Sequence, residues 1–116
     1  MFTPVRVEKP WGHELIWAHT DAYVGKILHI KAGERLSLQL HNVKDETIHL
    51  LSGKMRFEVE ENGAMTTRAL GPGESYRIRP GTKHRMAAVE TCDVLEASTP
   101  HLDDVVRLED AYGRAG

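Results

Sequence analysis

The sequence predicts a single all-β domain, residues 1–116, folded as an antiparallel sandwich or barrel. Short apolar runs of period two recur along the chain, and Gly, Pro, Asn and Asp separate them. The composition is 41% apolar and 28% charged, which is typical of a globular protein and not of a disordered one. At 116 residues the chain is long enough for one hydrophobic core.

In the first half of the chain, the segment Lys9 to Gly12 reads as a bend in which Trp11 covers apolar surface. Strands follow wherever apolar and polar residues alternate, and Asn42 to Asp45 interrupts the alternation as a turn. The expected strands here are 13–18, 23–30, 36–41, 47–51 and 54–60.

In the second half, Glu61-Asn62-Gly63 predicts a hairpin tip, and Gly71-Pro72-Gly73 cannot continue a central strand. Only the tail, residues 103–112, is expected to carry a helical turn. The expected strands are 65–70, 75–78, 84–89 and 93–97.

The charge pattern and the single cysteine exclude several classes of function. The net charge is −2 with acids and bases interspersed, so we expect neither nucleic acid nor an anionic membrane as a partner. No apolar run suits a signal peptide or a membrane span. Cys92 stands alone and reads as a buried small hydrophobe, so a reducing compartment, the cytoplasm, is expected.

Residues 33–53 hold the most informative pattern in the chain. Gln39 and His41 lie two apart in an alternating run, so on a strand both project from one face. If the next strand folds back after the turn, Glu46 returns to within one strand spacing, about 4.8 Å, of this pair. An amide oxygen, an imidazole and a carboxylate form part of a metal-ligand set, and His84 in the block GPGESYRIRPGTKHRM offers a fourth member.

These residues resemble the motifs of the cupins, a family of small β-barrel proteins. The first cupin motif is Gly, five residues, His-x-His, three or four residues, Glu, six residues, Gly, and here Gly33, Gln39-x-His41, Glu46 and Gly53 match every spacing. Gln39 stands where that motif has its first His. The second motif ends in Pro-x-Gly, two residues, His; here Pro80-Gly81 precedes His84, with the proline shifted by one position.

A narrower resemblance, to the type II phosphomannose isomerases, covers nearly the whole chain. That group often forms the C-terminal half of bifunctional mannose-phosphate enzymes, and the Gln-x-His pair is one of its marks. Here Asn42, Val43 and Lys44 stand where the isomerases usually have more histidine and an arginine. The similar segments are 9–12, 25–41, 52–55, 81–85 and 103–114.

The resemblance implies a jelly-roll barrel, also called a double-stranded β-helix, with one divalent metal ion. The ligands would be Gln39, His41, Glu46 and His84. Zinc is the first expectation for the metal, and manganese, iron, cobalt and nickel also suit this ligand set.

A metal ion with open positions would bind adjacent carbonyl and hydroxyl oxygens of a sugar and stabilise an enediolate as a Lewis acid. A proton shuttle is also required, and Lys26, His49 and Glu96 are the candidates. Arg85, next to His84, is the first candidate for binding a phosphate, followed by Arg107 and Lys26. The remaining histidines, His13, His19, His29 and His101, read as surface or packing residues.

The expected function is therefore a metal-dependent isomerase of a sugar or sugar phosphate, with a small molecule as its partner. Two alternatives stay open: a non-haem metal dioxygenase on the same barrel, or a non-catalytic module that binds a sugar or another ligand. The missing histidines and arginine after His41 favour the binding module. Because open barrels expose strand edges that a second copy often covers, we also expect a homodimer.

Overall fold

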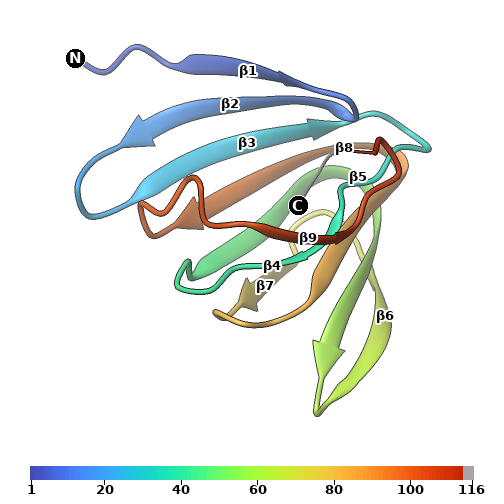
Figure 1. The fold of residues 1–116 in the computed structure, drawn as a ribbon. Helices are drawn as coiled ribbons and strands as arrows, with labels where there is room; N and C mark the ends of the chain where they lie inside the picture. The colour runs from blue at the N-terminus through green and yellow to red at the C-terminus, as the bar shows by residue number, and fades with distance from the viewer. Residues whose placement is uncertain (114–116) are drawn as a thin grey trace.

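A computed structural model describes residues 1–113, and the regular elements within this range are all β-strands (Figure 1). The described residues include no helix long and apolar enough to cross a membrane. The strands are β1 (Val5–Lys9), β2 (Gly12–His19), β3 (Val24–Ile30), β4 (Leu38–Leu40), β5 (Glu46–Glu61), β6 (Ala64–Leu70), β7 (Ser75–Ile78), β8 (His84–Ser98) and β9 (Val106–Glu109).

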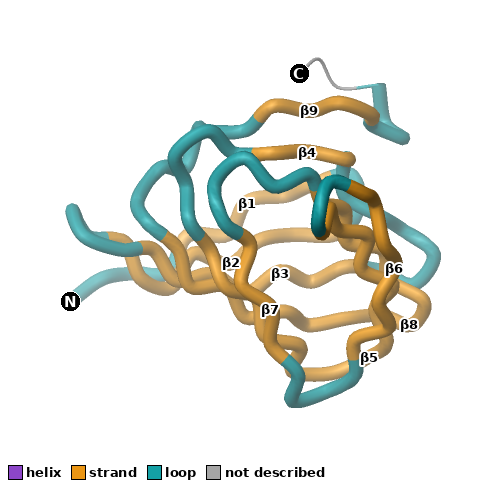
Figure 2. The backbone as a smooth tube through the Cα atoms, turned by 90° about the horizontal axis from the view of Figure 1, so that it is seen from below, coloured by secondary structure: helices purple, strands orange, loops and turns teal. Residues whose placement is uncertain are grey.

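β8 is the strand around which this sheet is organised. It pairs with β5 along almost its whole length, and its C-terminal half pairs with β3 on the other side. The start of β8 pairs with β4 through Gln39 and His84. Outward from these neighbours, β2 and β1 follow β3, β9 follows β4, and β6 and β7 pair with β5. All these pairings are antiparallel, and the sheet curls around an interior (Figure 2), which confirms the expected all-β antiparallel fold.

Two pairs of expected strands are each one long strand. Segments 47–51 and 54–60 both belong to β5, and segments 84–89 and 93–97 both belong to β8. The pairing register shifts between Ser52 and Lys54, where Gly53 has a φ of 93°. This is a β-bulge, so the glycine bends the strand without ending it.

The expected helical turn in residues 103–112 is wrong. The chain forms β9 there, and Gln39 pairs with Arg107 and Leu40 with Val106. β4 pairs with β8 on one side only, and its other edge pairs with this segment. This backbone pairing makes the segment a strand. Arg114, the last residue of the tail segment 103–114, lies outside the described residues.

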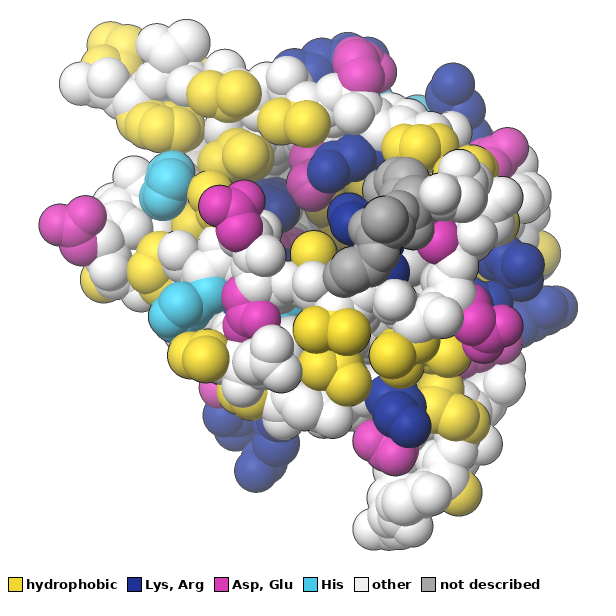
Figure 3. Space-filling view, in the orientation of Figure 1, with side chains coloured by type: hydrophobic (Ala, Val, Ile, Leu, Met, Phe, Trp, Pro, Cys, Tyr) yellow, Lys and Arg dark blue, Asp and Glu magenta, His cyan; other side chains and the backbone are white. Residues whose placement is uncertain are grey.

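The hydrophobic core lies on the inner face of the curled sheet. Trp11 is 2% exposed and belongs to the core cluster, so the bend at residues 9–12 seals one end of the interior. Cys92 is free and buried, as expected. Figure 3 shows acidic and basic side chains interspersed over one face of the surface, in keeping with the net charge of −2.

Candidate metal centre

Three of the expected ligands converge inside the sheet from three different positions in the chain. His41 follows β4, Glu46 begins β5, and His84 begins β8. One ligand atom from each residue lies within 4.8 Å of the others, and all three side chains are buried. The turn at residues 42–45 reverses the chain and returns Glu46 to His41, while the pairing of Gln39 with His84 brings β8 alongside.

The two imidazoles of this cluster are held in the same way. His41 Nδ1 lies 2.6 Å from the main-chain oxygen of Asp104, and His84 Nδ1 lies 2.9 Å from that of Thr82. Because a carbonyl oxygen only accepts, each Nδ1 carries the hydrogen and each Nε2 is left to bind a metal ion or a proton. Both Nε2 atoms are buried without a hydrogen bond.

The Nε2 atoms face the Glu46 carboxylate. His41 Nε2 lies 3.3 Å from Glu46 Oε2, and His84 Nε2 lies 3.8 Å from Glu46 Oε1. Burial opposes ionisation of Glu46, but its contact with His41 and the charge of Lys44 lower its pKa to about 2. Burial also lowers the pKa of His84, which favours the neutral imidazole that binds metals.

Gln39 lines the same cavity as His41 and Glu46. Its amide oxygen accepts a hydrogen bond of 2.7 Å from Ser37 Oγ. A carbonyl-type oxygen has two lone pairs, so this contact leaves one for another partner. The structure therefore brings all four expected ligands to one region.

The turn between His41 and Glu46 is fixed from outside by Asp104. Its carboxylate accepts hydrogen bonds from the main-chain N–H groups of residues 42, 43 and 44, at 3.0, 2.7 and 2.8 Å. These hydrogen bonds lower the pKa of Asp104 to about 2. Since the main-chain oxygen of Asp104 also receives His41 Nδ1, this one residue positions both the turn and the imidazole.

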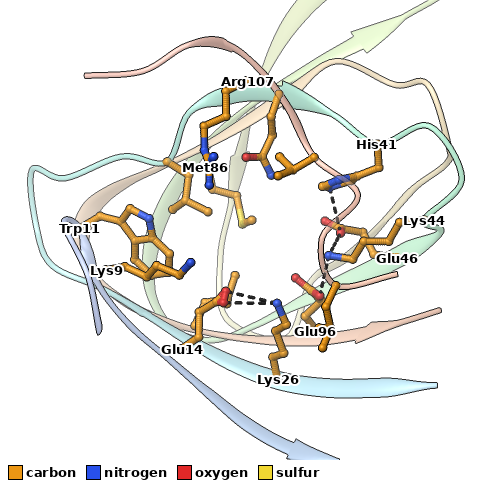
Figure 4. Close-up of a pocket in the computed structure, with 15 residues that line it drawn as sticks. Lys9, Trp11, Glu14, Lys26, His41, Lys44, Glu46, Met86, Glu96 and Arg107 are labelled. Atoms are coloured by element: carbon orange, nitrogen blue, oxygen red, sulfur yellow. Dashed lines mark hydrogen bonds and ion pairs between the residues drawn. The ribbon is translucent and has the colours of Figure 1, made fainter. Parts of the chain in front are cut away.

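Lys44, which was expected only as part of the turn at residues 42–45, is 5% exposed and lines the cavity. Its Nζ lies 2.8 Å from Glu46 Oε2 and 3.1 Å from Glu96 Oε2 (Figure 4). Burial would lower the pKa of Lys44, but the charges of Glu96 and Glu46 outweigh it and raise the pKa. Lys44 lies in the turn before β5, where strand alternation does not apply, so the sequence carries no local signal for its burial.

The floor of the cavity carries a second ion pair, between Lys26 and Glu14. Lys26 Nζ lies 3.2 and 3.3 Å from the two carboxylate oxygens of Glu14 (Figure 4). Glu96, whose strand position is opposite Lys26, is 3% exposed. Burial, and then repulsion by Glu46, raises the pKa of Glu96. Lys26 and Glu96 thus both line the cavity, whereas Glu14 was not among the expected site residues.

Arg85 and His49 do not line this cavity. Arg85 follows His84 on β8 and projects to the opposite face of the sheet, 3.6 Å from Glu58 and 3.7 Å from Glu109. His49 Nδ1 lies 2.7 Å from Ser75 Oγ on the outer side of β5. The cations that do line the cavity beside Lys26 and Lys44 are Lys9 and Arg107 (Figure 4).

The donor atoms of the cluster fit a divalent metal ion. Two imidazole nitrogens, a carboxylate and a nearby amide oxygen are ligands that zinc, manganese, iron, cobalt and nickel all accept. The buried Nε2 atoms without hydrogen bonds are the observation that favours an ion here, because buried polar atoms are otherwise nearly always satisfied. The cluster indicates a divalent-metal site and does not select one metal.

Residues 26–97 match the family described as Cupin domain. Mannose-1-phosphate guanylyltransferase ManC of Salmonella typhimurium strain LT2 is 33% identical over 113 residues, which are 93% of this chain and 23% of that protein. Alginate biosynthesis protein AlgA of Pseudomonas aeruginosa is 30% identical over the same shares of the two chains. The chain therefore spans less than a quarter of the length of these relatives.

Solved structures share the fold. The structure of KdgF from Halomonas sp. superposes with a TM-score of 0.76 at 22% identity, covering 85% of this chain and 90% of that one. A structure of oxalate decarboxylase from Bacillus subtilis gives a TM-score of 0.76 at 18% identity, covering 89% of this chain and 29% of that one. At these identities the similarity establishes the fold alone.

Proposed function

This chain belongs to the cupin family, and on that basis we propose that it is a metal-dependent isomerase of a sugar or sugar phosphate. The observation that carries the proposal is the buried His41–Glu46–His84 cluster, of which His41 and Glu46 line a cavity. We propose that these three residues and Gln39 hold the metal ion, with zinc as the first candidate.

The relatives support a phosphorylated sugar as the substrate class. Their names refer to mannose 1-phosphate and to alginate biosynthesis, so the similar regions occur in proteins that act on sugar phosphates or in sugar-polymer synthesis. The chain covers less than a quarter of those proteins, so their whole activity is not transferred to it. Mannose 6-phosphate and fructose 6-phosphate are the pair we propose, following the resemblance to the type II phosphomannose isomerases.

The metal ion, when bound, supplies Lewis acidity that stabilises negative charge on the substrate oxygens of an enediolate. Glu96 is the residue that we propose moves the proton between the two substrate carbons. Its raised pKa allows the carboxyl group to hold or release a proton closer to neutrality than an ordinary glutamate does. Lys26 is the second candidate for this role, and its pairing with Glu14 places a charged partner beside it.

Two cations at the cavity wall suit a phosphate group. Arg107 reaches the cavity from β9, and Lys9 reaches it from the end of β1 (Figure 4). We propose that they take the role that sequence reasoning gave first to Arg85, because Arg85 lies on the opposite face of β8. Guanidinium groups bind phosphate oxygens in a bidentate manner, which makes Arg107 the stronger of the two.

The test is an isomerase assay on protein whose metal content has been measured. Zinc-loaded protein is mixed with mannose 6-phosphate, and the formation of fructose 6-phosphate is followed by a coupled assay, then the reverse reaction. We expect turnover that chelation abolishes and that Glu96→Gln reduces at equal metal content. Metal-loaded protein without turnover in either direction would refute the isomerase proposal.

One observation favours a binding module as the second candidate. Three carboxylates of the cavity are held in ion pairs with lysines. Glu46 and Glu96 contact Lys44, and Glu14 contacts Lys26. A carboxylate held by an ammonium group has to leave that contact before it accepts a substrate proton, and this disfavours catalysis. Saturable binding of mannose 6-phosphate by calorimetry, without conversion, would support this candidate.

A further inference from the structure

Lys44 stands in an unusual place for a lysine. Its side chain is buried, and its ammonium group lies between the carboxylates of Glu46 and Glu96, at 2.8 and 3.1 Å (Figure 4). Its backbone is fixed by the carboxylate of Asp104, which accepts the N–H groups of the turn. Lysines are rarely buried unless paired, and Glu46 and Glu96 are the partners that hold this charge inside the protein.

Glu46 Oε2 is the atom at which Lys44 meets the candidate metal centre. That oxygen lies 2.8 Å from Lys44 Nζ and 3.3 Å from His41 Nε2. A metal ion held by His41, Glu46 and His84 therefore has to share the Glu46 carboxylate with an ammonium group. Like charges repel strongly at such separations in a buried site, where water does not screen them.

Glu96 is a second ion-pair partner for Lys44. The ammonium can keep its contact with Glu96 while it gives up its contact with Glu46, so the metal ion and Lys44 can both be accommodated. In the absence of a metal ion, the same ammonium neutralises Glu46, whose other close contacts are the two imidazoles.

We propose that Lys44 is an internal cation that competes with the divalent metal ion for Glu46 and so sets the metal affinity of the site. The inference rests on the proposed metal site and does not depend on which reaction the site catalyses. Lys44 is thus a positioning residue that acts through Glu46. It weakens metal binding and stabilises the metal-free cluster.

The test compares the affinity for Co²⁺ and Zn²⁺ of the wild type and Lys44→Met, a substitution that keeps the side-chain length and removes the charge. The affinity is measured by competition with a chromophoric chelator, and cobalt binding is confirmed from its visible absorption. We expect Lys44→Met to bind at least about tenfold more tightly, the scale on which residues next to metal ligands act. In thermal unfolding, its metal-free form should melt at a lower temperature and gain more from added metal than the wild type does.

The matched control is Lys26→Met, which removes a lysine charge from the same cavity without a contact to Glu46. Its metal affinity should stay near that of the wild type. If Lys44→Met does not fold, the pair Glu96→Gln and Lys44→Met/Glu96→Gln replaces it, because the double variant leaves fewer buried charges. The double variant should then bind metal more tightly than Glu96→Gln alone.

The outcomes separate this inference from the proposed function. Equal metal affinities in the wild type and Lys44→Met would refute the role of Lys44 and leave the metal site standing. An equal gain in affinity from Lys26→Met would also refute it, because the effect would then be one of general charge. Failure of every form to bind either metal would refute the metal site itself, and the role of Lys44 with it.

Discussion

At the scale of single residues, the candidate metal centre depends on hydrogen bonds to the main chain. Asp104 and Thr82 each accept the Nδ1 hydrogen of one imidazole, and this sets which nitrogen faces Glu46. Such contacts fix the tautomer and orientation of histidines that bind metals. The two rings lie 5.2 Å apart between their centroids, so both Nε2 atoms reach a common point.

Replacement of His84 by alanine should abolish metal retention and leave a soluble, folded protein. The side chain is buried and supplies one of the two imidazoles of the cluster. Metal content measured after purification in zinc-containing buffer checks this. His49→Ala is the control, because His49 lies outside the cavity, and it should keep its metal. Full occupancy in His84→Ala would remove His84 from the site.

At the scale of the elements, β5 shows how one long strand serves two parts of the fold. Its first residues pair with β7 and its later residues with β6, while β8 accompanies it on the other side. The bulge at Gly53 lies between these two parts. A Cβ at position 53 would lie 2.2 Å from the main-chain oxygen of Thr91, so the two backbones approach closely at this point.

Gly53→Ala should therefore destabilise the protein by at least about 2 kcal/mol, from the positive φ and the clash with β8 together. Urea unfolding followed by circular dichroism measures the free energy of unfolding. Gly63→Ala is the matched control, because Gly63 also has a positive φ, 79°, but a Cβ there meets nothing within 4 Å. It should cost only about 1 kcal/mol, from the backbone strain alone. Equal losses in both variants would contradict the role of the close approach.

The hairpin of β5 and β6 is tied to β7 by Glu61. Its carboxylate accepts hydrogen bonds from Arg68 on β6 and Tyr76 on β7. These hydrogen bonds lower the pKa of Glu61 from 4.5 to about 2. Because the folded-state pKa is the lower one, the ionised carboxylate stabilises the fold fully above pH 4.5, and this contribution is lost as the pH falls toward 2.

Glu61→Gln should accordingly lower the urea midpoint at pH 7, and its difference from the wild type should shrink between pH 4.5 and pH 2. Urea titrations of both proteins at several pH values measure this difference. Thr67→Val, a change on the same hairpin that leaves the Glu61 contacts intact, should show a difference that does not vary with pH. A constant difference for Glu61→Gln would contradict the role of its ionised form.

The sequence predicted the parts of this arrangement that local spacing encodes. Alternation predicted that Gln39 and His41 share one face, and the turn predicted that Glu46 returns close to them. The expected hairpin tip is also present, with Asn62 and Gly63 both at positive φ between β5 and β6. The burial of Lys44 could not be read in the same way. It depends on Glu96, which comes from a strand that is distant in the sequence.

The remaining differences have the same origin in tertiary pairing. β9 is a strand because β4 lies beside it, although its four residues show no long alternation. Residues 47–51 and 54–60 were expected to form two strands. They form one strand with a bulge at Gly53, because β8 pairs with the residues before and after this glycine. Arg85 is next to His84 in sequence and on the opposite face in space, which alternation along β8 explains.

At the scale of the whole molecule, the candidate site and the hydrophobic core share one interior, because Trp11, Leu28 and Met86 of the core line the same cavity as His41 and Glu46. The core cluster is made of hydrophobic residues, including Trp11, Phe57 and Met86, and contains none of His41, Glu46 and His84. Because apolar packing holds this cluster, we expect the core to stay folded when a metal ion is lost. The protein should be folded without metal and more stable with it.

Metal should raise the free energy of unfolding by about 2.7 kcal/mol at a free concentration about one hundred times its dissociation constant, by mass action. Thermal unfolding with zinc, and again after a chelator is added, measures the shift and its reversal. The near-ultraviolet circular dichroism of the chelated protein should remain that of a packed core. A melting temperature that is the same with zinc and with chelator would contradict metal binding by the folded state.

The central position of β8 has a consequence for how the protein is made. Val24 pairs with Ser98 and Ile30 pairs with Cys92, so β3 has no neighbour on that side until β8 has been synthesised. A chain leaving the ribosome therefore exposes the edges of β3 and β5 during most of its translation. Completion of the sheet therefore waits for β8, and we expect it to be slow because the pairings that close it join segments far apart in the sequence.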